Sequence, residues 1–91
     1  MAKLTKEEIV KRHSDLKRSY CYEMRRKDIL EDTITRWENS KDPNRQKHID
    51  SLQHQFDETI IYMAEMLDEI NNVETEMKKR LIKFEPLFKK L

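Results

Sequence analysis

The chain has 91 residues and a net charge of +1, so it has room for one small domain and no strong overall field for nucleic acid or membranes. Charged residues make up 41% of the sequence, hydrophobic residues 36%, and glycine is absent. The lack of glycine excludes the tight turns of β-sandwiches and the glycine-rich loops that bind phosphate, so the sequence predicts an all-α protein.

The first predicted helix covers about residues 6–39. Thr5 and Glu8 have the spacing of a capping box, which marks a helix start. From Ile9 to Trp37, mostly apolar residues recur at alternating intervals of three and four. This spacing places them on one face of a helix, so the segment is expected to pack against another helix.

Three residues on this stripe are polar or charged. His13 lies near its start, and we expect a partly buried packing residue with a hydrogen-bond partner rather than a metal ligand. Glu23 and Lys27 form a polar layer in the middle of the stripe. Such a layer is expected to fix the register of helix packing at some cost in stability.

A turn interrupts the pattern after residue 39. Asp42 is a favoured N-cap residue and Pro43 suits the first helical position, so a second helix is expected over about residues 43–84. Pro86 disfavours helical geometry at the residue before it. Because the predicted turn is short, the two helices should form an antiparallel hairpin.

The second predicted helix carries an apolar seven-residue repeat with additional apolar residues beside it. One partner helix cannot cover so wide a face, so the hairpin is expected to complete a helical bundle or coiled coil. It would do so by self-association, with a four-helix bundle favoured, or with partner subunits. The residues expected at the partner interface are Ile49, Leu52, Phe56, Ile60, Met63, Met66, Leu67, Ile70, Val73 and Met77.

Charge is distributed unevenly between the two predicted helices. Residues 11–27 include seven basic and two acidic side chains, whereas residues 50–76 include eight acidic side chains and neither lysine nor arginine. Attraction between these stretches would favour the antiparallel orientation. The alternative is that both sets of charges solvate an outer face.

The C-terminal residues 78–91 form a basic amphipathic tail, with six basic residues and one acidic residue. In an antiparallel hairpin this tail is expected to project beyond the start of the first helix. It could dock on a partner helix or an acidic surface, or its lysines could complement the helix dipole alone. The residues expected to dock are Leu81, Phe84, Phe88, Lys78, Lys79 and Lys83.

No residue pattern predicts a catalytic, metal or cofactor site. His48 and His54 are six residues apart, which places them on different faces of a helix. Cys21 lacks a nearby histidine that would activate it and cannot form an internal disulfide. The sequence therefore predicts neither an enzyme nor a small-molecule substrate. With no apolar run long enough to cross a membrane and no secretory signal, the expected location is intracellular, cytoplasmic by default.

These features favour a non-enzymatic helical protein-interaction module, a small accessory or assembly subunit of a larger intracellular complex. Residues 1–91 are expected to form one helical domain. The alternative is an adaptor whose basic tail binds an anionic membrane surface or nucleic acid. Salt separates the two hypotheses, because binding to phosphates weakens steeply with salt whereas association through apolar burial does not.

Overall fold

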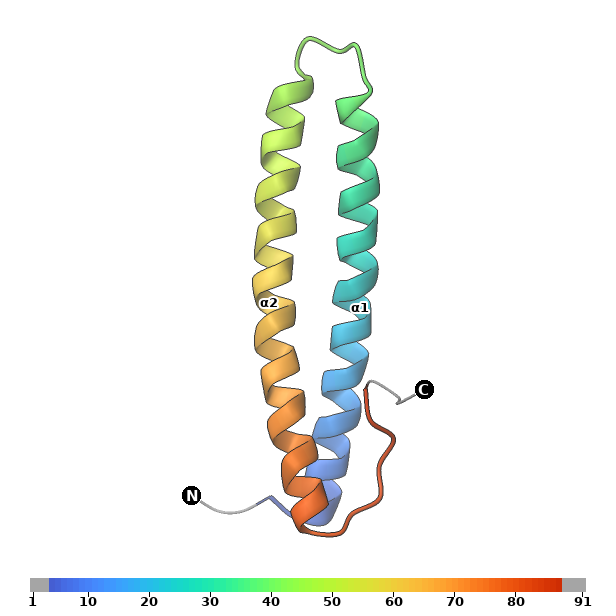
Figure 1. Ribbon diagram of the computed structural model, residues 1–91, viewed down its shortest axis with the longest axis vertical. Helices are drawn as coiled ribbons and strands as arrows, with labels where there is room; N and C mark the ends of the chain where they lie inside the picture. The colour runs from blue at the N-terminus through green and yellow to red at the C-terminus, as the bar shows by residue number, and fades with distance from the viewer. Residues whose placement is uncertain (1–3, 88–91) are drawn as a thin grey trace.

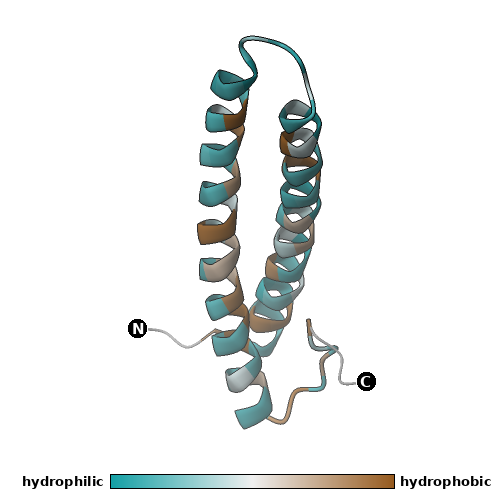
Figure 2. Ribbon diagram, turned by 45° about the horizontal axis from the view of Figure 1, so that its top comes forward, coloured by the Kyte–Doolittle hydropathy of each residue, from teal (hydrophilic) through white to brown (hydrophobic). Residues whose placement is uncertain are grey.

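The computed structural model describes residues 4–87 and consists of two antiparallel helices, α1 (Lys6–Glu38) and α2 (Arg45–Lys79) (Figure 1). The prediction of an all-helical hairpin is confirmed, and no strand occurs within residues 4–87. Hydrophilic residues cover most of both helices, with hydrophobic residues at intervals along them (Figure 2). This pattern matches the apolar stripes that the sequence predicted.

The predicted capping box begins α1. The Thr5 hydroxyl accepts a hydrogen bond from the Glu8 amide at 3.2 Å, and the Glu8 carboxylate accepts one from the Thr5 amide at 3.0 Å. These hydrogen bonds hold the pKa of Glu8 below its ordinary value of 4.5, and the bond from the Thr5 amide has the largest effect. The first turn of α1 is therefore fixed by side chains that lie three residues apart.

The connection between the helices is slightly longer than predicted, because α2 begins at Arg45 rather than at Pro43. The Asp42 carboxylate accepts a hydrogen bond from the Asn44 amide at 2.8 Å, so Asp42 stabilises the turn instead of capping the helix. The Arg45 guanidinium donates to the carbonyl of Ser40 at 3.1 Å. The predicted capping role of Asp42 is thus replaced by a local turn.

Helix α2 ends at Lys79, five residues before the predicted end at residue 84. The Leu81 amide donates to the carbonyl of Lys78 at 3.1 Å, and the Ile82 amide donates to the carbonyl of Met77 at 2.9 Å. Leu81 adopts a left-handed conformation with φ of 58°. These are the features of a Schellman motif, which reverses the chain direction at a helix end.

The residues that follow, 82–87, are called the strap here. The strap turns back and runs beside α1 instead of projecting beyond the hairpin (Figure 1). Ile82 is only 9% exposed and joins a core cluster with Ile9, Val73 and Met77. The expectation of a projecting tail is therefore corrected for the described residues, because chain reversal at Leu81 and burial of Ile82 hold this segment against the helices.

Two clusters of buried residues lie in the half of the hairpin that the strap covers, while Leu30 and Ile34 are buried in the other half. The first cluster, with Ile82, is partly covered by Phe84, and the second is partly covered by Leu87. The second cluster comprises Tyr20, Met63, Met66 and Ile70. The strap thus adds a third layer to one half of an otherwise two-layered structure.

Candidate interaction site

A buried histidine–carboxylate pair joins the two helices beneath the strap. The His13 Nε2 lies 2.9 Å from the Glu74 Oε2, and His13 is 5% exposed. The His13 ring meets the Phe84 ring edge-on, with centroids 5.3 Å apart. The prediction that His13 is a packing residue with a hydrogen-bond partner is confirmed.

The same carboxylate also holds the strap. The Glu74 Oε2 accepts a hydrogen bond from the Leu87 amide at 3.3 Å, and the Lys17 Nζ donates to the Glu85 carbonyl at 2.6 Å. Within the described residues, no buried side-chain nitrogen or oxygen lacks a hydrogen-bond partner. Since every such buried polar atom is satisfied, we assign the strapped half a structural role.

The interface residues predicted on α2 divide between the two halves of the hairpin. Five are buried within the chain, where they pack as core: Met63, Met66, Ile70, Val73 and Met77. Four others are half-buried: Ile49, Leu52, Phe56 and Leu67. Ile60 is 40% exposed. The buried five pack within the chain, and the exposed part of the stripe is the surface left for a partner.

One face of the hairpin carries both the strap and the exposed part of the stripe. Lys17 contacts the strap, and Met24, Glu31 and Glu38 follow at intervals of seven residues, which keeps them on the same side of α1. On α2, Leu67 packs beside Leu87 in the second core cluster, and Ile60 and Gln53 precede Leu67 at the same interval. The uncovered part of this face, between residues 24–38 and 49–60, is called the unstrapped seam here.

The unstrapped seam contains a hollow of about 300 Å³. Its apolar lining comes from Ile34 and Phe56, and Glu31 and Glu38 lie at its edge on α1. Gln53 and Thr35 complete the lining. The hollow therefore combines an apolar floor with carboxylates.

The turn end of the hairpin is closed by an aromatic contact. Trp37, in the last turn of α1, stacks on His48 with ring centroids 4.1 Å apart and an interplanar angle of 14°. Sequence reasoning did not predict this pair, although the two residues lie symmetrically about the turn. The pair therefore links the two helices next to the turn.

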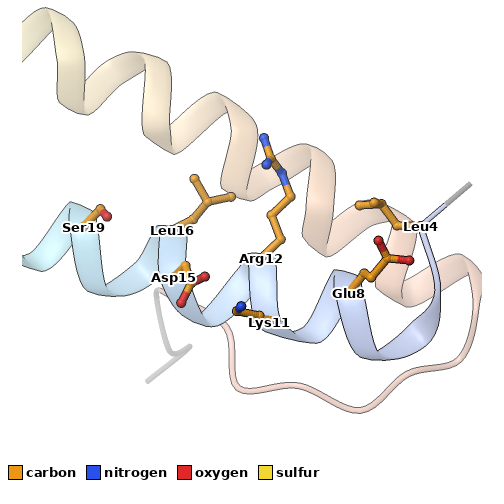
Figure 3. Close-up of a pocket in the computed structure, with 7 residues that line it drawn as sticks. All are labelled: Leu4, Glu8, Lys11, Arg12, Asp15, Leu16 and Ser19. Atoms are coloured by element: carbon orange, nitrogen blue, oxygen red, sulfur yellow. The ribbon is translucent and has the colours of Figure 1, made fainter. Parts of the chain in front are cut away.

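The opposite face of the hairpin is polar. A hollow of about 450 Å³ lies there, where Arg12 and Leu16 reach toward α2 (Figure 3). The Arg12 guanidinium forms an ion pair with Glu69 at 2.8 Å. Glu8, Lys11 and Asp15 alternate in sign around this hollow, as expected for a solvated helix surface rather than a reaction centre.

The basic stretch of residues 11–27 and the acidic stretch of α2 form few direct ion pairs with each other. Among the described residues, Arg12–Glu69 is the one ion pair that links a lysine or arginine of residues 11–27 to α2. Lys27 pairs with its neighbour Asp28 at 3.3 Å, and Glu23 is half-buried in a hollow that Tyr62 also lines. Exposed ion pairs contribute less than about 1 kcal/mol each, so packing rather than charge holds the helices together.

The residues predicted for tail docking lie in different surroundings. Leu81 is 90% exposed at the bend, and Phe84, within the strap, is half-buried against the first core cluster. Lys78, Lys79 and Lys83 are exposed, whereas Phe88 lies outside the described residues. The sequence analysis did not identify Glu74, Ile82 or Leu87 as strap contacts, because no glycine marks the chain reversal.

Other kinds of site were also sought. Within residues 4–87, no group of three histidine, cysteine or acidic side chains is placed to hold a metal ion. Cys21 is exposed, and His54 pairs with Glu58 at 2.8 Å on the surface of α2. Neither helix of the described chain has the length and apolar character needed to cross a membrane.

Comparison with protein-family models, with curated proteins and with solved structures finds no match to this chain.

Proposed function

We propose that this protein is a non-enzymatic helical interaction module, and that a partner protein packs on the unstrapped seam. One observation carries the proposal: the apolar stripe of α2 is buried where the strap covers it and partly exposed where the strap ends. Ile70 is 0% exposed, whereas Phe56, fourteen residues earlier in the same row, is half-buried. In the neighbouring row, Leu67 beside the strap residue Leu87 is half-buried, whereas Ile60, seven residues earlier, is 40% exposed. Partly exposed apolar residues along one face are typical of a surface that is completed by association.

The strap indicates how such a partner would bind. It adds a third layer over the seam, with Leu87 against the second core cluster. A partner segment placed further along the same face would cover Met24 and Ile60 in the same way. Each fully buried side chain of this size contributes roughly 1.5–3 kcal/mol, so a few such contacts support specific binding.

The adaptor hypothesis is supported by a different observation. Lys78, Lys79 and Lys83 are all exposed near the end of α2, where they could meet anionic phosphates. The nearby apolar residues Ile82 and Phe84 face the core cluster instead, which leaves less apolar surface for a membrane. We therefore place the adaptor second.

Site-specific photo-crosslinking tests the module hypothesis. A photoreactive amino acid at position 60 should give a discrete adduct in cells that express the protein, whereas position 61 is the matched control. Ile61 is also exposed but is one residue further around the helix, on a different face. An adduct of defined mass at position 60 alone is the expected result. Equal labelling at both positions, or none at position 60, would contradict the proposal.

Salt dependence tests the adaptor hypothesis separately. Binding to vesicles with anionic lipids or to oligonucleotides would weaken steeply between about 50 and 200 mM salt. Substituting glutamine for Lys78, Lys79 and Lys83 should abolish such binding and leave crosslinking at position 60 unchanged. Loss of both properties in this variant would favour the adaptor over the module.

A further inference from the structure

We infer that the unstrapped seam binds a cationic amphipathic helix of a partner protein. The inference rests on the proposed function and adds the chemistry of the partner. Its basis is the combination of an apolar floor with carboxylates on both sides of the same groove.

Apolar residues of both helices form the floor of the groove. Met24 on α1 and Ile60 on α2 are 36% and 40% exposed, and Ile34 and Phe56 line the hollow nearer the turn. Apolar residues contributed by two neighbouring helices suit a third helix that packs into the groove between them. The hollow of about 300 Å³ can receive a large apolar side chain from such a helix.

The rims of the groove are mostly acidic. Glu31 and Glu38 border the hollow on α1, and Asp57 on α2 accepts a hydrogen bond at 3.0 Å from Gln53, which also lines it. Lys27 is the basic residue on this part of the seam, and it pairs with Asp28. Within residues 4–87, three carboxylates along the groove form no ion pair with a lysine or arginine: Glu31, Glu38 and Asp57. Lysine or arginine side chains of a partner helix would complement them.

The ends of the groove set the length of the partner segment. Glu38, the last residue of α1, borders the hollow at one end of the groove, and the strap residue Leu87, packed on the Tyr20 cluster, closes the other. From Met24 to Trp37 the axis of α1 rises by about 20 Å at 1.5 Å per residue. A partner helix of about 14 residues, or four turns, fits this length.

Model peptides provide the test. The probe is a peptide of about 14 leucine and lysine residues with leucines at helical spacing. Two controls are the same peptide with glutamate for lysine and a scrambled peptide of unchanged composition. Calorimetry measures binding, and Trp37, the single tryptophan and the neighbour in sequence of Glu38 at the hollow, is a fluorescence reporter for a second measurement. The cationic amphipathic peptide should bind at least about tenfold more tightly than either control.

Matched charge reversals locate the binding. The seam variant combines Glu31→Lys with Asp57→Lys. The control variant combines Glu58→Lys with Glu65→Lys and changes the net charge by the same amount. Glu58 lies away from the seam, where it lines a hollow with Tyr62. The seam variant should bind at least about tenfold more weakly, and the control variant should change by less than about threefold. Circular dichroism confirms that both variants remain helical. Equal weakening in both, or equal binding of the anionic peptide, would overturn the inference.

The crosslinking result separates this inference from the function on which it rests. An adduct at position 60 without binding of the cationic peptide would retain the interaction module and overturn the proposed partner chemistry. Absence of both would overturn the module as well.

Discussion

His13 and Glu74 are 61 residues apart in sequence, yet their side chains meet at 2.9 Å and are 6% and 15% exposed. The Glu74 oxygen that contacts His13 also accepts the amide of Leu87. One carboxylate oxygen thus joins α1, α2 and the strap. This arrangement makes Glu74 the polar residue on which the strapped half depends most.

Replacement of Glu74 should therefore lower the free energy of unfolding by more than the loss of one surface charge would. Glu74→Ala leaves both the His13 ring and the Leu87 amide without their acceptor, and we expect a loss of about 2–3 kcal/mol in the free energy of unfolding. Glu74→Gln keeps an acceptor oxygen and should lose less. Urea unfolding followed by circular dichroism measures both. Equal stability of the alanine variant and the wild type would contradict the role assigned to Glu74.

Leu81 offers a stabilising substitution. Its φ of 58° places a side chain with a β-carbon in the left-handed region, and its side chain is 90% exposed. Leu81→Gly should raise stability by about 0.5–1 kcal/mol, because relief of backbone strain outweighs the added freedom of the unfolded chain. Leu81→Ala retains the β-carbon and serves as the control, with little expected change in the thermal midpoint. A glycine variant less stable than the alanine variant would argue against the chain reversal at this residue.

Ile82 should contribute to folding although it follows the end of the second helix. It is 9% exposed and packs with Ile9, Val73 and Met77. Ile82→Ala is expected to lower the free energy of unfolding by about 2 kcal/mol or more, as for other buried isoleucines. A projecting tail would instead tolerate this change without loss. Thermal unfolding distinguishes the two outcomes.

The capping box predicts a pH dependence. Because hydrogen bonds from Thr5 lower the pKa of Glu8 in the folded protein, the ionised carboxylate stabilises the fold above pH 4.5, and this contribution is lost as the pH falls through the lowered pKa. Glu8→Gln cannot ionise, so its thermal midpoint should fall less than that of the wild type between about pH 6 and about pH 3. Parallel decreases in the two proteins would show that Glu8 does not contribute to the acid response.

The hairpin could be predicted from the sequence because its determinants are local or periodic. Thr5 and Glu8 marked the start of the first helix, and the apolar stripes indicated which faces meet. The position of His13 on the stripe was enough to predict that it is buried and hydrogen-bonded, but not that Glu74 is the partner. Each of these features depends on residue spacing along one helix.

The strap could not be predicted in the same way. Its reversal depends on a leucine in a conformation that usually indicates glycine, and its attachment depends on Glu74, distant in sequence. Lys17 shows the same limitation, because it binds a backbone carbonyl 68 residues away. Without the strap, the sequence analysis assigned Met63 and Ile70 to a partner, whereas both lie in the core of this chain.

The attachment of the strap also has a consequence for the order of folding. The Trp37–His48 stack closes a loop of about ten residues, which takes place in well under a microsecond in flexible chains. The strap makes contacts across more than 60 residues, and these require both helices to be in place first. We therefore expect the hairpin to form from its turn toward its open end, with docking of residues 82–87 as the last step. In native-state hydrogen exchange, the strap should accordingly open before the helices separate.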